Sequence, residues 1–187
     1  MPVLKRIKFW LVLIILLPAS VLAEDSGVFI ENLKVYSQEK NYLLDADVTF
    51  QLSQTVEQAL RNGVALVWVV QIKVWKKRKF LWDTTEVVFT DNYRIRYYAL
   101  LNKYQIMDEQ SQTLKRFNSL RAALTHLGKL RGVRVIAKKD LKRNADYDIG
   151  LQIALDKERL PLPLRTTAYI SSDWSLSSQW QRWALKQ

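Results

Sequence analysis

Residues 64–91 place the tightest constraint on the fold of this chain. They read VALVWVVQIKVW, then KKRK, then FLWDTTEVVFTD. Because side chains alternate between the two faces of a strand, every second residue from Val64 to Val74 shares one apolar face. The β-branched and aromatic residues favour a strand over a buried helix, and four adjacent cations mark the point where the chain reverses. The segment therefore predicts a β-hairpin with a core first strand and a turn that faces water or an anionic partner.

Alternating apolar residues predict strands on both sides of this hairpin. We expect them at residues 28–36 with a bulge near Asn32, 44–53, 93–101 after a turn at Asp91 and Asn92, 113–117, 133–137 and 147–155. Two short helices are expected, one between a cap at Ser53 and Gly63, the other from Asn118 or Ser119 to Gly128 or Gly132. The apolar stripe of the second helix comprises Leu120, Leu124, Leu127 and Leu130.

These elements predict a mainly β fold. We expect an antiparallel β-sandwich or a strongly curved sheet of about eight strands with two short helices. An α+β layer with both helices on one face is the alternative. Pro161 and Pro163 predict an extended linker, and the Trp-rich segment 161–187 is expected to pack back on the sheets. In that segment Trp180 and Trp183 have the spacing of a helical turn or a tight wrap.

The first 23 residues have the pattern of a secretory signal peptide. Lys5, Arg6 and Lys8 precede a short apolar run that ends at Pro18, and Val21 and Ala23 occupy the positions that a signal peptidase reads. The run is about half of the roughly 20 residues that span a bilayer, which favours cleavage after Ala23 over an uncleaved anchor. We therefore expect an exported protein with one domain from residue 24 to residue 187.

The composition limits the classes of molecule that such a domain is expected to bind. The formal charge of the whole chain is +11, and removing the signal peptide, with its three cations and no anion, leaves +8. Outside the cytoplasm a basic protein meets anionic lipids, anionic envelope polymers or acidic outer domains of membrane proteins rather than nucleic acid. The chain contains no Cys, so its stability depends on the packed core alone.

Several segments together resemble a known family. They are YLLDADVTFQLSQTVEQALRNGVALVW, the Tyr-rich stretch that follows the hairpin, LPLPL and SSDWSLSSQWQRW. The most specific parts are AL-x-x-GV-x-L at residues 59–66 and the W-S-L-S-S-x-W-x-x-W ending. In these the chain is similar to the secreted proteobacterial family called domain of unknown function 4390. The resemblance implies a Gram-negative periplasmic setting and no catalytic residues.

The residue inventory argues against most catalytic chemistry. His126 is the one histidine, and it falls at the polar flank of its expected helix, as an exposed histidine does. With no thiol, neither a Cys-based nucleophile nor a soft-metal site is expected, and we expect no cofactor. Asp173 is the one acid in an unusual setting, and hydrogen bonds from Ser171, Ser172 or Ser175 that fix a turn explain it better than catalysis does.

The hairpin turn is the best candidate binding site. Two tryptophans flank a run of cations there, a combination that suits contact with anionic headgroups or glycans. The candidate residues are Lys73, Trp75, Lys76, Lys77, Arg78, Lys79 and Trp82. We therefore expect a non-catalytic binding protein of the cell envelope. A carboxylate-based hydrolase and a carrier that holds an apolar ligand inside the sandwich are the alternatives.

Overall fold

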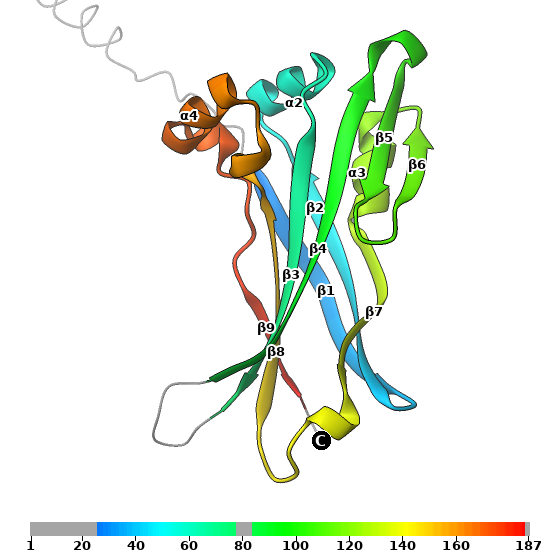
Figure 1. Cartoon of the computed structure of the whole chain (residues 1–187), viewed down its shortest axis with the longest axis vertical. Helices are drawn as coiled ribbons and strands as arrows, with labels where there is room; N and C mark the ends of the chain where they lie inside the picture. The colour runs from blue at the N-terminus through cyan, green and yellow to red at the C-terminus, as the bar shows by residue number, and fades with distance from the viewer. Residues whose placement is uncertain (1–25, 78–83, 186–187) are drawn as a thin grey trace, which may run out of the picture.

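The computed structural model describes residues 26–77 and 84–185, in which nine strands form two antiparallel sheets accompanied by three α-helices (Figure 1). The smaller sheet has the order β1-β2-β7, and the larger has the order β6-β5-β4-β3-β8-β9. The strands are β1 (Gly27–Gln38), β2 (Asn41–Gln51), β3 (Leu66–Lys76), β4 (Thr84–Tyr98), β5 (Lys103–Asp108), β6 (Thr113–Phe117), β7 (Lys129–Ala137), β8 (Tyr147–Leu155) and β9 (Gln181–Leu185). The helices are α2 (Gln54–Arg61), α3 (Leu120–Leu127) and α4 (Leu162–Ile170). The expected mainly antiparallel β class is confirmed.

The core lies between the two sheets. Trp68 of β3 and Leu44 of β2 are both 0% exposed, and the rings of Trp68 and Phe50 meet edge to face at 4.7 Å across the gap. The alternation of β3 explains this arrangement, because Leu66, Trp68, Val70, Ile72 and Val74 all point inward and none is more than 3% exposed. The hairpin strand predicted from residues 64–75 is therefore the central strand of the core.

The predicted bulge and both predicted helix caps are present. The β1–β2 register shifts between Glu31 and Lys34, and Asn32 adopts a φ of 50° there. Ser53 caps α2 by accepting the Val56 N–H at 3.2 Å, and Gly63 follows the helix at a φ of 87°. Ser119 caps α3 in the same way, and that helix ends at Gly128.

Two sequence expectations are wrong in this part of the fold. Leu130 lies in β7 and does not belong to the α3 stripe. No turn occurs at Asp91 and Asn92, because β4 continues through both residues to Tyr98, and the returning strand is β5. Within the strand the Asp91 carboxylate accepts the Asn92 N–H at 2.8 Å. It therefore has a backbone hydrogen bond of the kind that Asp commonly forms in turns.

The proline-rich segment forms a helix instead of an extended linker. Pro161 is the N-cap of α4, and Pro163 lies in its first turn, where a missing N–H breaks no helical hydrogen bond. The chain then enters the core at Trp174 and Leu176, each 1% exposed. Trp183 lies in β9, which pairs with β8, so the spacing of Trp180 and Trp183 does not mark a helical turn. β9 is therefore the strand at one edge of the larger sheet.

Candidate functional site

The described part of the predicted hairpin site lies at the end of β3. Lys73, Trp75, Lys76 and Lys77 are described, whereas Arg78, Lys79 and Trp82 lie outside the described residues. Lys76 pairs with Tyr147 at the start of β8, and the Lys77 N–H donates to the Asp146 carbonyl at 2.8 Å. The Lys77 Nζ also forms an ion pair with Asp148 at 2.9 Å. These contacts join the hairpin to the loop that precedes β8.

That loop brings a second group of cations to the same end of the molecule. The Lys138 N–H donates to the Lys40 carbonyl at 2.8 Å, which links the loop to the β1–β2 turn, and the Lys142 N–H donates to the Tyr147 hydroxyl at 3.1 Å. Figure 1 shows the described end of β3, the β1–β2 turn and the loop before β8 at the lower end. We call this group the basic end, and it comprises Lys40, Lys76, Lys77, Lys138, Lys139, Lys142 and Arg143.

The basic end carries an excess of positive charge. Its neighbouring carboxylates are Glu39, Asp140, Asp146 and Asp148, fewer than its cations. Lys77 forms a salt bridge with Asp148. The other members except Lys76 are exposed residues, and the Lys138 ammonium lies 5.9 Å from the Tyr42 ring. This arrangement can attract a polyanion without first breaking internal ion pairs.

Trp75 is not part of the accessible surface of the basic end. It lies on the outer face of β3, is 8% exposed and packs against Trp180 with ring centroids 5.2 Å apart. Lys73 Nζ lies 4.6 Å from the Trp180 ring, and the Arg182 guanidinium lies 4.4 Å from the Trp75 ring. The stack of two cations and two indoles therefore fastens β9 to the sheet.

A cleft that the sequence did not predict opens between the two sheets. It has a volume of about 320 Å³ and lies between β4, β5 and β6 on one side and α3 and β7 on the other. Its apolar floor comprises Ile106, Leu127, Leu130 and Val133, and its polar lining comprises Tyr93, Asp108, Ser111, Thr113, Lys115, Lys129, Arg131 and His126. The cleft thus gathers ionisable groups from four strands and a helix.

His126 lines this cleft and is half-buried, contrary to the expected exposed position. Its ring stacks at 5.1 Å on Phe117 because β6 packs against that flank of α3. Burial, and then the charge of Lys115, lower the pKa of His126, so it is neutral at neutral pH. The permanent cations of the cleft are therefore Lys115, Lys129 and Arg131.

The strand register explains why polar groups face the interior here. Trp68 pairs with Tyr93, Tyr93 with Asp108, and Asp108 with Thr113, so one inward-facing row crosses four strands. Asp91 lies in the adjoining row and is 7% exposed. Burial raises the pKa of Asp91, and the charges of Asp108 and Glu109 add to the effect. Burial and the hydrogen bond to Asp91 also raise the pKa of Tyr93.

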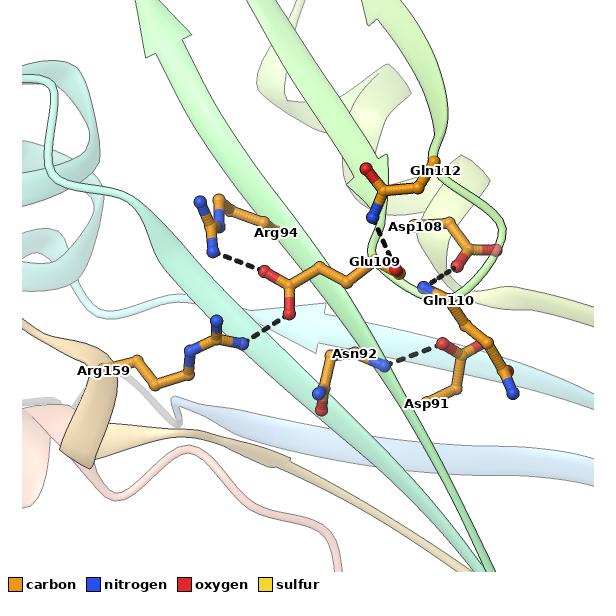
Figure 2. A network of polar contacts seen from close by, with 8 residues as sticks. All are labelled: Asp91, Asn92, Arg94, Asp108, Glu109, Gln110, Gln112 and Arg159. Carbon is orange, nitrogen blue, oxygen red and sulfur yellow. Dashed lines mark hydrogen bonds and ion pairs between the residues drawn. The ribbon is translucent and has the colours of Figure 1, made fainter.

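The neighbouring acids have structural partners. Figure 2 shows Glu109 between Arg94 and Arg159, with an N–O distance of 2.5 Å to each. Burial alone would raise the pKa of Glu109, but the hydrogen bond from Arg159 and the charges of both arginines lower it. Asp108 accepts the N–H groups of Gln110 and Ser111, which fixes the β5–β6 turn. These carboxylates hold elements together, and one of them, Asp108, also lines the cleft.

Asp173 has a turn-fixing role, but with other donors than expected. Its carboxylate accepts the Thr55 hydroxyl at 2.7 Å, and its carbonyl accepts the Ser53 hydroxyl at 3.1 Å. The segment before Trp174 is thereby tied to the start of α2. Among residues 26–77 and 84–185, no group of three or more potential metal ligands occurs.

Comparisons with known proteins identify the family. In the described part of the chain, none of the helices has the length and apolar character needed to cross a membrane. No curated protein and no solved structure matches the sequence. The family model described as Domain of unknown function (DUF4390) matches residues 25–184 and so covers both sheets. The chain therefore belongs to the family of domain of unknown function 4390.

Proposed function

We propose that this protein is a non-catalytic binding protein of the bacterial periplasm that contacts an anionic envelope polymer through its basic end. The observation that carries the proposal is the convergence of the β3 end, the β1–β2 turn and the loop before β8, whose described cations outnumber the described carboxylates beside them. The signal-like first 23 residues support an exported setting, where such polymers are the abundant polyanions. Lipid and an acidic protein domain are the competing partners.

The chemistry of the basic end favours a polymer over a bilayer. Its contacts with solvent come from flexible cationic side chains, and none of its described residues exposes a large apolar group. Binding to a bilayer gains strength from buried apolar area as well as from charge. A surface that offers charge alone fits a repeating polyanion and predicts binding that weakens steeply with salt.

The test removes charge from the loop before β8. Lys139, Lys142 and Arg143 are exposed, and their side chains form no hydrogen bond or ion pair with the described residues, so replacing all three with Ser leaves the fold intact. We expect the variant to elute from immobilised dextran sulfate at a clearly lower salt concentration than the parent protein. The matched control replaces Arg96, Lys103 and Arg116, three cations at the opposite end of the larger sheet. The proposal is contradicted if both variants elute at equally lowered salt concentrations, or if the variant of the loop before β8 elutes as the parent protein does.

The inter-sheet cleft favours a second candidate function, the binding of a small anionic ligand with an apolar part. Its volume of about 320 Å³ is at the lower end of ligand pockets, and its lining combines an apolar floor with cations. Asp108 is the one carboxylate of that lining, whereas a two-carboxylate hydrolase needs a pair. Replacing Lys115 and Lys129 with Ser tests this function. An anionic fluorescent probe such as anilinonaphthalene sulfonate that binds both proteins equally would refute it.

A further inference from the structure

The turn between β4 and β5 exposes apolar side chains far from the core. Ala99–Leu101 forms a single 3₁₀ turn, in which Leu100 is 103% exposed and Leu101 is 58% exposed. Tyr98, at the end of β4, is 39% exposed. We call residues 98–101 the apolar tip, and Figure 1 shows it at the upper end, opposite the basic end. Two leucine side chains exposed to solvent at the end of a hairpin indicate a surface that contacts another molecule.

The tip is rigidly supported. The Tyr97 hydroxyl donates to the Asn102 side chain at 2.9 Å, and Asn102 adopts a left-handed φ of 47° that closes the turn. Below it, the Tyr97 and Tyr104 rings pack with centroids 4.8 Å apart, and Tyr104 pairs in turn with Phe117. The apolar tip is therefore presented in a fixed geometry by three strands, and docking costs little conformational entropy.

Cations surround the apolar tip on the outer face of the same strands. Tyr98 pairs with Lys103, and one step further down Arg96, Gln105 and Arg116 form a row across β4, β5 and β6. Arg96 and Arg116 are exposed, and Lys103 is half-buried and donates to the Asn118 side chain. Between residues 92 and 139 the chain carries two carboxylates, Asp108 and Glu109, both at the other end of β5. The tip and its collar of Arg96, Lys103 and Arg116 thus have one sign of charge.

We propose that the apolar tip inserts into the surface of an anionic lipid bilayer. Leucine and tyrosine side chains at the apex would enter the boundary between headgroups and acyl chains, while the collar contacts the lipid phosphates. Both kinds of contact are needed, because the apolar area of a single turn is small and each cation near an anionic membrane adds a modest attraction. This inference goes beyond the proposed function, since it concerns the opposite end of the molecule and a different partner.

The experiment measures sedimentation with vesicles. The chain from Glu24, which contains every residue of both sheets, is mixed with vesicles of phosphatidylglycerol and phosphatidylethanolamine, or of phosphatidylcholine alone. We expect binding to the anionic vesicles and at least about tenfold weaker binding to the neutral ones. Replacing both Leu100 and Leu101 with Ser should weaken anionic-vesicle binding about tenfold or more, and replacing the three collar cations with Ser should do the same.

The matched control is Leu114→Ser. Leu114 is an exposed leucine, 39% exposed, on β6 of the same sheet, but it lies near the opposite end of that strand from the tip. We expect this variant to bind vesicles as the parent does. All variants should keep the parent's circular dichroism spectrum, which shows that they are folded, and the parent's dextran sulfate elution, which separates this test from that of the basic end. Parent-like binding by the tip variant, an equal loss for Leu114→Ser, or no vesicle binding by the parent overturns the inference.

Discussion

At the scale of single residues, the contact between Trp75 and Gly150 shows how the β3–β8 pair accommodates a bulky aromatic ring. A Cβ atom on Gly150 would lie 2.4 Å from Trp75 Cζ3, 2.7 Å from Trp75 Cη2 and 3.2 Å from Trp180 Cε3. Glycine is therefore required here by the space that the indole occupies. The same indole carries the contact to Arg182, so its position also determines how β9 is held.

Gly150→Ala should consequently displace Trp75 and loosen β9. We expect a loss of about 1–3 kcal/mol in the free energy of unfolding, as for overpacking elsewhere. Denaturant unfolding followed by tryptophan fluorescence measures it. Ala154→Ser, on the same outer face of β8 and half-buried, is the control and should cost less than about 0.5 kcal/mol. An unchanged unfolding midpoint for Gly150→Ala would show that the ring relaxes freely.

Asp91 and Asp108 predict opposite dependences of stability on pH. The raised pKa of Asp91 means that the folded state binds its proton more tightly than the unfolded state does. Its contribution is therefore lost as pH rises from the ordinary aspartate range through the raised value. Burial would also raise the pKa of Asp108, but hydrogen bonds from Ser111 and Gln110 lower it, so its contribution exists above the ordinary value and is lost on acidification.

The two Asn variants separate these effects. Asp91→Asn keeps an acceptor for the Asn92 N–H and removes the buried charge, so it should stabilise the protein at pH 7 and lose that advantage near pH 4. Asp108→Asn also keeps an acceptor, but it removes the charge that strengthens the hydrogen bonds from Gln110 and Ser111, so it should destabilise the protein at pH 7 by up to about 1 kcal/mol. Denaturant unfolding at pH 7 and pH 4 shows whether each variant raises or lowers the free energy of unfolding. If both variants shift the midpoint in the same direction at pH 7, the assignment of the Asp91 charge is wrong.

At the scale of elements, local signals predicted what depends on local physics. The strict alternation in β2, β3 and β8 and the Ser caps of α2 and α3 identified these elements with little error. The continuity of β4 was missed, because the turn-forming residues Asp91 and Asn92 are held in a strand by pairing with β3. α4 was missed because Pro163 was expected to prevent a helix that it in fact begins. In both cases tertiary pairing or position within the element decided the structure.

The two helix caps provide an element-scale prediction. Ser53 caps α2, is 6% exposed and also donates to the Asp173 carbonyl, whereas Ser119 caps α3 at an exposed position with its one hydrogen bond to Ala122 N–H. Ser53→Ala should cost about 2 kcal/mol and Ser119→Ala about 1 kcal/mol in the free energy of unfolding. Thermal and denaturant unfolding measure both. Equal costs would show that the link from α2 to the C-terminal segment contributes nothing.

At the scale of the whole molecule, the larger sheet separates two kinds of surface. The basic end and the apolar tip lie at opposite ends of β4, a strand of 15 residues. Sequence analysis named the cations of β3 but could not join them to the cations of the loop after β7, because that contact depends on the long-range β3–β8 register. The cleft was missed for the same reason, since its lining comes from residues that only the strand pairing brings together.

This separation predicts that the protein can hold a lipid surface and a polyanion at the same time. Because the two surfaces share no residue, occupying one should leave the affinity of the other unchanged within about 0.5 kcal/mol. Adding dextran sulfate to the protein on anionic vesicles should therefore carry the labelled polymer into the vesicle pellet. Replacing Lys139, Lys142 and Arg143 with Ser should remove the polymer from the pellet and leave the protein there, whereas replacing Leu100 and Leu101 should leave both in solution. Release of the protein from vesicles by the polymer would mean that both partners compete for one charged face, and the bridging arrangement would be wrong.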